Sequence, residues 1–435
     1  MKTMKTMKHF LSMAAFALMG AMMTGCSNDD NINNPQPESK SKLETLTTTI
    51  SLGEDGTTRA LTPGGVKTFA AGEQIAVIYL NTNSNIKKAV STALTTTDIS
   101  NEGKTATFTV TVEDPDKTKT VVYVYPASMI NDDGTVNVAA LATQDGTFDT
   151  LESSLDFAMG AGNWNGDELP SSVSLVNQLA ILAITLKDAD GTNDITSTIT
   201  GMTLSDGTDT YTVTREAAAG PIYVAFTPVN NSNITITATD GTKNYFKSLT
   251  GKTYASNNGY NVSWKMYGVG DVILADGNFA ARSSTTGTIV AMITYLGSST
   301  GVEDYTHGLA LALTDNASMN WSTATGASGA AAHTPAAPTP ITSSWMLPSK
   351  DQWNKMIDAC KNVLGTKNNY QDLRDGFSGI AGASNLESSE LFGYWSSTEY
   401  EGNSDFAWVF YFDGSGWVER PKEIVDPLAL ACLAF

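Results

Sequence analysis

Residues 105–112 read TATFTVTV, so that an apolar side chain alternates with threonine along the whole segment. A period of two is typical of a β-strand with one buried face and one solvated face. Runs rich in β-branched and aromatic residues recur at 43–50, 75–80, 121–125, 179–186 and 222–226. Helical periodicity is almost absent up to about Trp264, so we expect this half of the chain to be all-β.

Turn signals separate these runs. The tripeptide Asp-Gly-Thr occurs six times, beginning at Asp55, Asp133, Asp145, Asp190, Asp206 and Asp240. Asp-Gly tolerates the positive φ angles of tight hairpins, and the threonine can start the next strand. A calcium loop would need several oxygen ligands that converge on one point. The isolated pairs therefore predict turns, and their irregular spacing is not that of a solenoid repeat.

The composition excludes several classes of protein. Only 16% of the 435 residues are charged, and 45 acidic against 26 basic residues give a net charge of −19. Such a protein lacks the electrostatic drive to bind nucleic acid. Three histidines and three cysteines are too few and too dispersed for a four-ligand zinc site. Histidine catalysis would be confined to His307 or His333, so we expect a binding or structural protein without cofactor or metal, and not an enzyme.

The N-terminus carries an export signal. Three lysines precede an apolar stretch over 10–23, which is too short to span a membrane as a helix. Residues 23–26, Met-Thr-Gly-Cys, resemble a bacterial lipobox, although Met23 stands where leucine is usual. The resemblance implies a lipoprotein signal peptide over 1–25 and a lipid on Cys26 that anchors the chain to the outer membrane.

The residues that follow Cys26 form a tether. Residues 27–30, Ser-Asn-Asp-Asp, resemble the signal that sends Bacteroides-type lipoproteins to the outer face of the outer membrane. The alternative is a solvated linker, which we favour less. We expect 26–59 to comprise the lipidated linker and a first strand at 43–52.

The sequence changes character after Lys265. Ser349 can cap a helix, with Gln352 as the partner in a capping box. A single apolar face follows, formed by Trp353, Met356, Ile357, Cys360 and Leu364. Strands are expected at 394–399, 406–413 and 417–419, before an apolar end at 428–435. This part is therefore expected to be α+β.

Several segments of the first half resemble the Bacteroidia fimbrillin family. They are 69–77 (FAAGEQIAV), 175–184 (LVNQLAILAI), 249–254 (LTGKTY) and 260–264 (YNVSW). The resemblance implies two tandem transthyretin-like β-sandwiches, which we place at 60–168 and 169–267, and other pilin subunits as partners.

The resemblance also gives Arg59 a role. Pilins of this family are cut after such an arginine, so it implies cleavage between Arg59 and Ala60. The cut would remove the first strand and the lipid and would leave a groove for a strand of a neighbouring subunit. The alternative is an ordinary arginine in a loop.

Segments of the second half resemble C-type-lectin-like and sulfatase-modifying-factor domains. They are 345–353 (WMLPSKDQW), 394–400 (YWSSTEY) and Ala407-Trp408. The resemblance implies an α+β adhesive domain over 268–435 that contacts a host or bacterial surface glycan or protein. The chain lacks the Glu-Pro-Asn, Gln-Pro-Asp and Trp-Asn-Asp segments of calcium-dependent lectins, so it gives no reason to expect calcium or those sugar ligands.

The same resemblance implies a disulfide between Cys360 and Cys432, which an exported protein permits. The alternative is two buried free thiols. Trp395, Trp408 and Trp417 could all stack on sugar rings, but Trp395 and Trp408 sit inside strand motifs, so we favour the core for those two. Trp417, beside a turn, and a polar patch are the candidate ligand-binding residues; the patch comprises Tyr400, Glu399, Glu401 and Asp405.

Together these features predict a fimbrial tip adhesin at the cell surface, made as an outer-membrane lipoprotein and assembled by donor-strand exchange. A lectin-like domain occupies the C-terminus, so such a subunit could accept a strand but not donate one. The alternative is a permanently lipid-anchored protein that binds glycan or protein and never polymerises.

Overall fold

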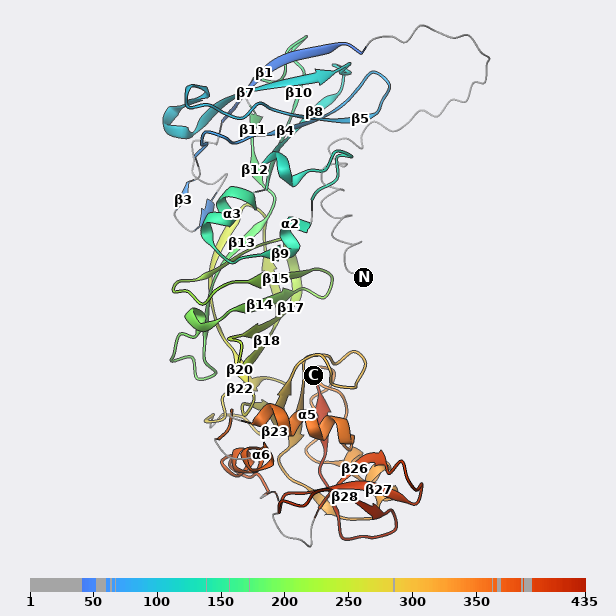
Figure 1. The fold of residues 1–435 in the computed structure, drawn as a ribbon. Coiled ribbons are helices and arrows are strands. Elements are labelled where there is room, and N and C mark those ends of the chain that lie inside the picture. The colour runs from blue at the N-terminus through green and yellow to red at the C-terminus, as the bar shows by residue number, and fades with distance from the viewer. Residues whose placement is uncertain are drawn as a thin grey trace, which may run out of the picture. The chain divides into compact units, whose positions relative to one another are not determined.

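The computed structural model describes residues 41–51, 60–62, 65–66, 68–137, 139–155, 157–171, 173–284, 286–361, 363–365, 369–384, 386 and 393–435. Contacts divide the chain into two compact units. The first comprises residues up to Thr185, Gly201–Ile236 and Ser248–Ser263, and the second comprises Leu186–Thr200, Thr237–Lys247 and Trp264–Phe435. The structure is mainly β, as the alternating runs predict (Figure 1).

Two sheets of the first unit enclose one core. The first sheet has the order β11-β1-β7-β6 and contains β1 (Leu43–Ser51), β6 (Ile99–Ser100), β7 (Thr105–Glu113) and β11 (Val173–Ser174). The second has the order β12-β10-β8-β4-β5 and contains β4 (Ala76–Leu80), β5 (Ile86–Val90), β8 (Thr120–Tyr125), β10 (Ala158–Asn163) and β12 (Val176–Asn177). Short elements complete this part, namely the hairpin β2 (Ala60–Thr62) and β3 (Gly65–Val66) and the 3-10 turns at Thr96–Asp98, Asn101–Gly103 and Ala127–Met129.

The strand β7 shows why these sheets pack face to face. Its apolar residues Ala106, Phe108, Val110 and Val112 are buried, while the threonines between them are half-buried or exposed. Side chains alternate between the faces of a strand, so the apolar set of β7 reaches the core that also holds Tyr123 of β8. The prediction of a half-buried strand at 105–112 is confirmed.

Two further sheets contain the strands from 143 to 268. One has the order β16-β13-β19, with β13 (Ala180–Lys187), β16 (Ile222–Phe226) and β19 (Asn258–Lys265). The other has the order β20-β18-β17-β14-β15-β9, with β9 (Thr143–Gln144), β14 (Gly201–Ser205), β15 (Thr210–Thr214), β17 (Val229–Thr239), β18 (Asn244–Tyr254) and β20 (Tyr267–Gly268). The helices α2 (Ala139–Ala142) and α3 (Phe148–Ser154) and a 3-10 turn at Thr196–Thr198 lie between strands.

The strands do not follow a division at 168/169. β9 precedes that point, yet it pairs in parallel with β15 of the later sheet. β11 and β12 follow it, yet they pair with β1 and β10 of the earlier sheets. The chain therefore exchanges short strands across the expected boundary, which local composition does not reveal.

The Asp-Gly-Thr tripeptides form turns where the structure describes them. The glycines after Asp133, Asp145, Asp190, Asp206 and Asp240 all have φ between 73° and 88°. In four of them, the exception being Asp190, the aspartate accepts a hydrogen bond from the backbone N–H of the threonine. This side-chain bond fixes the turn. The turn after Asp145 leads into α3, however, and not into a strand.

The C-terminal part of the second unit has two more sheets. One has the order β22-β21-β23-β24-β30, with β21 (Val272–Leu274), β22 (Phe279–Ala280), β23 (Ile289–Leu296), β24 (Gly308–Ala312) and β30 (Cys432–Ala434). The other has the order β25-β29-β26-β27-β28, with β25 (Asn316–Ser318), β26 (Tyr394–Glu399), β27 (Phe406–Tyr411), β28 (Gly416–Pro421) and β29 (Leu428–Ala429). The helices are α4 (Trp321–Thr325), α5 (Lys350–Cys360) and α6 (Asn369–Ser378), with a 3-10 turn at Ala330–Ala332.

Helix α5 begins as its sequence predicts. The Ser349 side chain accepts from the Gln352 N–H, and the Gln352 side chain accepts from the Ser349 N–H. Trp353, Met356 and Ile357 face the core. The helix ends at Cys360, however, so Leu364 lies beyond it.

The last residue is built into the second unit. The main-chain oxygen of Phe435 accepts from the N–H of His307 at 2.7 Å and of Gly308 at 3.0 Å. Its ring lies 5.2 Å from the rings of both Phe246 and Phe279. Cys432 exchanges two hydrogen bonds with Met346 on the side of β30 away from β24. Both edges of β30 are therefore occupied.

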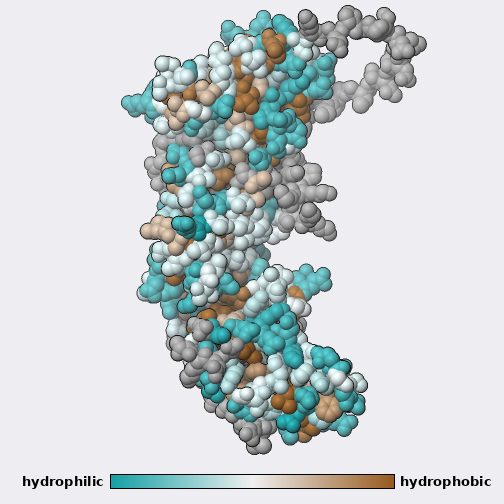
Figure 2. Space-filling view, viewed as in Figure 1, coloured by the Kyte–Doolittle hydropathy of each residue, from teal (hydrophilic) through white to brown (hydrophobic). Residues whose placement is uncertain are grey.

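Among the described residues, no helix has the length and apolar character needed to cross a membrane. The face drawn in Figure 2 carries scattered hydrophobic residues among hydrophilic ones.

Candidate functional site

Two strands of the second unit present aromatic side chains on one face. The register of β27 and β28 pairs Phe410 with Trp417 and Trp408 with Glu419. Residues two apart on a strand share a face, so Trp408, Phe410 and Trp417 project together. Phe410 is buried, whereas both tryptophans are half-buried. The outer part of this face is therefore aromatic and accessible.

A helix and a turn complete the site. Tyr400, after β26, lies edge-on to Trp408 at 5.1 Å between ring centroids, and Trp408 lies edge-on to Trp417 at 6.4 Å. Lys350 of α5 places its ammonium 3.2 Å from the centroid of Trp408. We call the following side chains the aromatic cluster: Lys350, Asn354, Tyr400, Glu401, Trp408 and Trp417.

Both indole N–H groups are satisfied within the cluster. Trp408 Nε1 donates to Glu401 Oε2 at 3.2 Å, and Trp417 Nε1 donates to Asn354 Oδ1 at 2.8 Å. The pKa of Glu401 is lowered, first by its own backbone N–H, then by the Trp408 N–H and by the charge of Lys350. The cluster thus fixes two rings and holds one carboxylate and one ammonium beside them.

This arrangement suits binding better than bond making. Half-buried indole rings offer flat apolar surface, and their neighbours offer a carboxylate, an amide and an ammonium for polar contacts. Sugar rings and amphipathic peptide segments combine these properties. In the part of the chain that the structure describes, no three His, Cys, Asp or Glu side chains gather as a metal site would require.

The structure brings together three of the five candidate ligand-binding residues, namely Trp417, Tyr400 and Glu401. Glu399 instead pairs with Lys422 at 2.6 Å, and that ammonium lies 4.3 Å from the Trp321 ring. Asp405 lies in an exposed turn, where its carbonyl accepts from the Lys422 N–H. Glu399 and Asp405 are therefore outside the cluster.

Of the two tryptophans expected in the core, only one belongs there. Trp395 is fully buried, as expected. Trp408 is half-buried and central to the cluster, so that assignment was wrong. Every residue of β27 is apolar or aromatic, so the sequence holds no periodicity by which to tell that Ala407 and Val409 are buried while Trp408 between them is half-buried.

The expected disulfide between Cys360 and Cys432 is not formed; both thiols are free and buried. Cys360 Sγ contacts the Thr294 carbonyl of β23 at 3.7 Å. Cys432 lies in β30, and β24 runs between β23 and β30. The two cysteines thus have different neighbours, Thr294 of β23 for Cys360 and the flanking strand β24 for Cys432. Burial raises the pKa of both thiols.

Other predicted residues lie elsewhere. Cys26 and Arg59 fall outside the described residues, and Ala60 begins β2. His307 packs against the Phe246 ring at 5.2 Å, and His333 Nδ1 lies 3.0 Å from Asn316 Oδ1. Burial lowers the pKa of both histidines.

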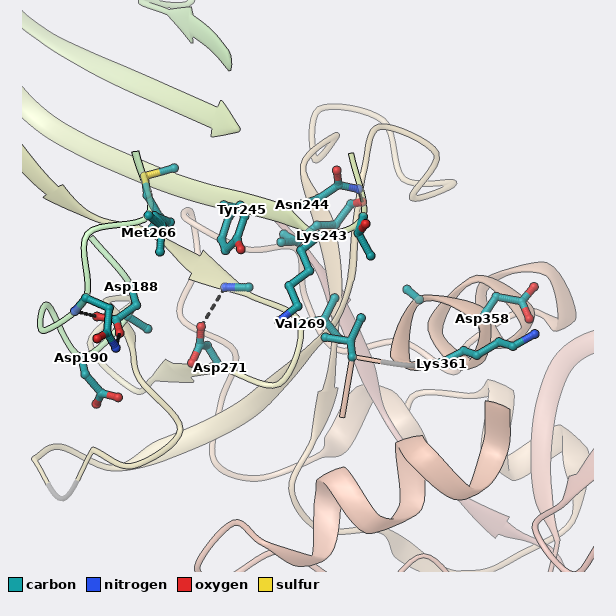
Figure 3. Close-up of a pocket in the computed structure, with 18 residues that line it drawn as sticks. Asp188, Asp190, Lys243, Asn244, Tyr245, Met266, Val269, Asp271, Asp358 and Lys361 are labelled. Atoms are coloured by element: carbon teal, nitrogen blue, oxygen red, sulfur yellow. Dashed lines mark hydrogen bonds between the residues drawn. The ribbon is translucent and has the colours of Figure 1, made fainter. Parts of the chain in front are cut away.

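A cavity of about 510 Å³ is a second candidate within the second unit. Figure 3 shows Asp188 and Asp190 on one side of it and Asp358 and Lys361, at the end of α5, on the other. Two of its four carboxylates, Asp188 and Asp271, already accept hydrogen bonds from the backbone. Asp271 accepts from the Gly268 N–H at 2.7 Å and the Arg282 N–H at 3.2 Å, and Asp188 accepts from the Asn193 N–H. These bonds shape loops, so we favour the aromatic cluster as the binding site.

No protein family model and no curated protein matches the chain. Among solved structures, a fimbrial protein from Bacteroides ovatus is similar over 90% of this chain and 98% of its own, with 13% identity and a TM-score of 0.27. A fimbrial assembly protein from Parabacteroides distasonis covers 51% of this chain and 91% of its own, with 12% identity and a TM-score of 0.29. A shaft pilin from Lactobacillus rhamnosus covers 52% and 99%, with 10% identity and a TM-score of 0.22. Similarities with TM-scores this low do not assign a function to the chain.

Proposed function

We propose that the chain is a fimbrial tip subunit and adhesin, which accepts a strand from a neighbouring subunit and does not donate one. The observation that carries the proposal is the position of Phe435. Its main-chain atoms are bonded to His307 and Gly308 and its ring is packed against Phe246 and Phe279. Release of β30 would break the core of the second unit, so this strand is not free to join another chain.

The other end of the chain supports the acceptor role. β1 lies between β7 and β11 and precedes Arg59 by eight residues, counted from Ser51. Cleavage after Arg59 would make β1 a separate peptide held only by non-covalent contacts. Its departure would expose an edge of β7 and the side chains of Phe108 and Val110, and such an edge is a strong acceptor for an extended segment.

The adhesive role is assigned to the aromatic cluster. Trp408 and Trp417 supply stacking surface, and Glu401 and Lys350 supply charge beside it. We propose a surface glycan or protein of the host or of another bacterium as the ligand, and binding in place of catalysis. A lipid on Cys26 would hold the precursor at the outer membrane until cleavage.

Tagged pili test the tip position. An epitope inserted between Asn83 and Ser84, in the exposed turn between β4 and β5, leaves the C-terminus intact. Immunogold labelling is expected only at pilus ends, and a label along the shaft would contradict the tip position.

The N-terminus of the surface-exposed protein separates the two candidate functions. A start at Ala60 supports assembly. A retained, lipidated Cys26 on all copies would favour the second function, which is that of a lipid-anchored binding protein that never polymerises. The position of β1 between β7 and β11 is compatible with that function as well.

A further inference from the structure

We infer that the incoming strand is selected at two inward positions of β1, by an acidic residue in the place of Glu44 and a hydroxyl residue in the place of Thr48. The occupant is a strand of a second pilin chain. The inference rests on the proposed function, because it requires that β1 be exchanged.

The register of β7 decides which positions face inward. β1 pairs antiparallel with β7 along its full length, from Leu43 opposite Glu113 to Ser51 opposite Thr105, but pairs with β11 at only two positions. Figure 1 shows β1 beside β7. An incoming strand that uses the same edge inherits this register. Its residues at the even positions of β1 then face the core, where Thr48 and Ile50 are buried and Leu46 is half-buried.

Thr48 provides a buried polar contact. Its hydroxyl donates to the Pro170 carbonyl at 2.8 Å across 122 residues of sequence, and the residue is 2% exposed. The Tyr123 hydroxyl is also buried and makes no hydrogen bond with the described residues. Burial raises the pKa of Tyr123 to about 12, while the neighbouring Thr48 hydroxyl opposes the rise. An aliphatic side chain at this position would leave the Pro170 carbonyl without its donor and would leave Tyr123 beside a purely apolar group.

Glu44 provides the second contact. Its Oε2 lies 2.7 Å from Lys117 Nζ, and both side chains are mostly sheltered, with 16% and 20% exposure. Lys117 also contacts Asp167 at 2.8 Å, but that carboxylate is 92% exposed. The Lys117 ammonium lies 5.8 Å from the Trp164 ring. Without β1, the ammonium would keep only the solvated partner, so an acidic residue on the incoming strand restores the sheltered pair.

The outward positions provide matched controls. The Thr45 hydroxyl lies 3.0 Å from that of Thr111, and the Thr49 hydroxyl lies 3.2 Å from that of Thr107, both exposed to solvent. Thr47 is exposed as well. Water can replace these contacts, so substitutions there are expected to have little effect on affinity.

The test uses the whole exported chain, cleaved after Arg59 so that β1 remains bound as a separate peptide. Synthetic 41–52 peptides compete for the site, and release of fluorescently labelled β1 is followed to equilibrium. We expect Thr48→Ser to compete nearly as well as the unmodified peptide. Loss of a buried hydrogen bond predicts that Thr48→Val competes roughly tenfold or more weakly. The control Thr47→Val should stay within about twofold.

The charge contact is tested separately. Glu44→Gln should compete less well than the unmodified peptide, and most of the difference should disappear on a Lys117→Ala protein in a double-mutant cycle. The remainder reflects the exposed Lys42, which lies within the peptide 3.0 Å from Glu44. If the unmodified peptide never displaces β1, exchange itself fails, and with it the acceptor role. The unmodified peptide could displace β1 while Thr48→Val and Glu44→Gln compete as well as it does. In that case the selection at positions 44 and 48 is overturned, but the acceptor role stands.

Discussion

The ammonium of Lys350 lies 3.2 Å from the centroid of the Trp408 ring and 5.5 Å from that of Trp417. Among the described side chains Lys350 forms no ion pair, so the two indole rings are its principal neighbours. This contact joins the first turn of α5 to β27 and β28. It therefore orients the rings of the aromatic cluster before any ligand arrives.

Removal of the Lys350 charge should loosen this contact. A cation–π interaction at an accessible site contributes about 0.5–1 kcal/mol, so Lys350→Gln should lower the free energy of unfolding by about that much. Lys350→Arg should retain most of it. Urea unfolding followed by tryptophan fluorescence measures the difference, and equal stability of the Gln and Arg variants would contradict the role given to the charge.

Trp417 should be needed for adhesion. Its ring is half-buried and its Nε1 is held by Asn354, so Trp417→Ala removes stacking surface from an oriented ring. We expect binding to an array of surface glycans and extracellular-matrix proteins to fall about tenfold or more, because a stacked ring at a binding centre typically contributes at least 2 kcal/mol. Glu399→Gln is the control, because Glu399 lies outside the cluster. Equal loss in both variants would place the ligand elsewhere.

The two buried cysteines should behave as thiols. In a Cys26→Ser protein, a thiol reagent should label neither Cys360 nor Cys432 in the native state and both after unfolding. A reducing agent should leave Tm unchanged. A lower Tm on reduction, with no labelling after unfolding, would mean that the disulfide forms.

Stability should depend on the ionisation of Asp271. Burial raises its pKa to about 6 from an ordinary value of 3.8. The folded state then binds more protons than the unfolded state between about pH 4 and 6, so this carboxyl makes the free energy of unfolding fall as pH rises through that window. Above about pH 6 Asp271 is ionised in both the folded and the unfolded state, so its contribution to the free energy of unfolding no longer changes with pH. Asp271→Asn should flatten this part of the profile.

Asp276→Asn serves as the control for that profile. Asp276 is exposed, and hydrogen bonds from Asn278 lower its pKa. Ionised Asp276 therefore raises the free energy of unfolding, and this contribution is lost only as the pH falls below 4. An unchanged slope between pH 4 and 6 in the Asp271→Asn protein would contradict the prediction.

Phe435 should be a main support of the second unit. Removal of a buried phenylalanine side chain typically costs about 3–5 kcal/mol, so Phe435→Ala should unfold this unit at a markedly lower urea concentration. Val425→Ala is the control, because Val425 is 57% exposed. Hydrogen exchange supplies a second measurement, since the amides of Cys432 and Phe435 should be as protected as those of β24. Rapid exchange there would mean that β30 can leave its sheet.

Local chemistry made much of this fold predictable. The alternation at 105–112 specifies the two faces of β7, and the Ser349–Gln352 capping box specifies where α5 begins. The Asp-Gly-Thr turns follow from the same kind of information, because glycine and aspartate favour the turn conformation whatever surrounds them. Three of the five candidate binding residues, all placed near strand ends and turns, lie together in the aromatic cluster, and their role in binding stays a prediction.

Contacts between distant residues decided the rest. β9 joins a later sheet and β11 an earlier one, and a strand of only two residues carries no sequence signal of its partner. Trp408 lines a surface cluster because Lys350, 58 positions away in the sequence, lies over its ring. Cys360 and Cys432 lie on α5 and β30 as free thiols, and whether two cysteines are bonded depends on how those elements pack. Periodicity records which face of an element is buried, but which element covers that face is determined only when the whole chain packs.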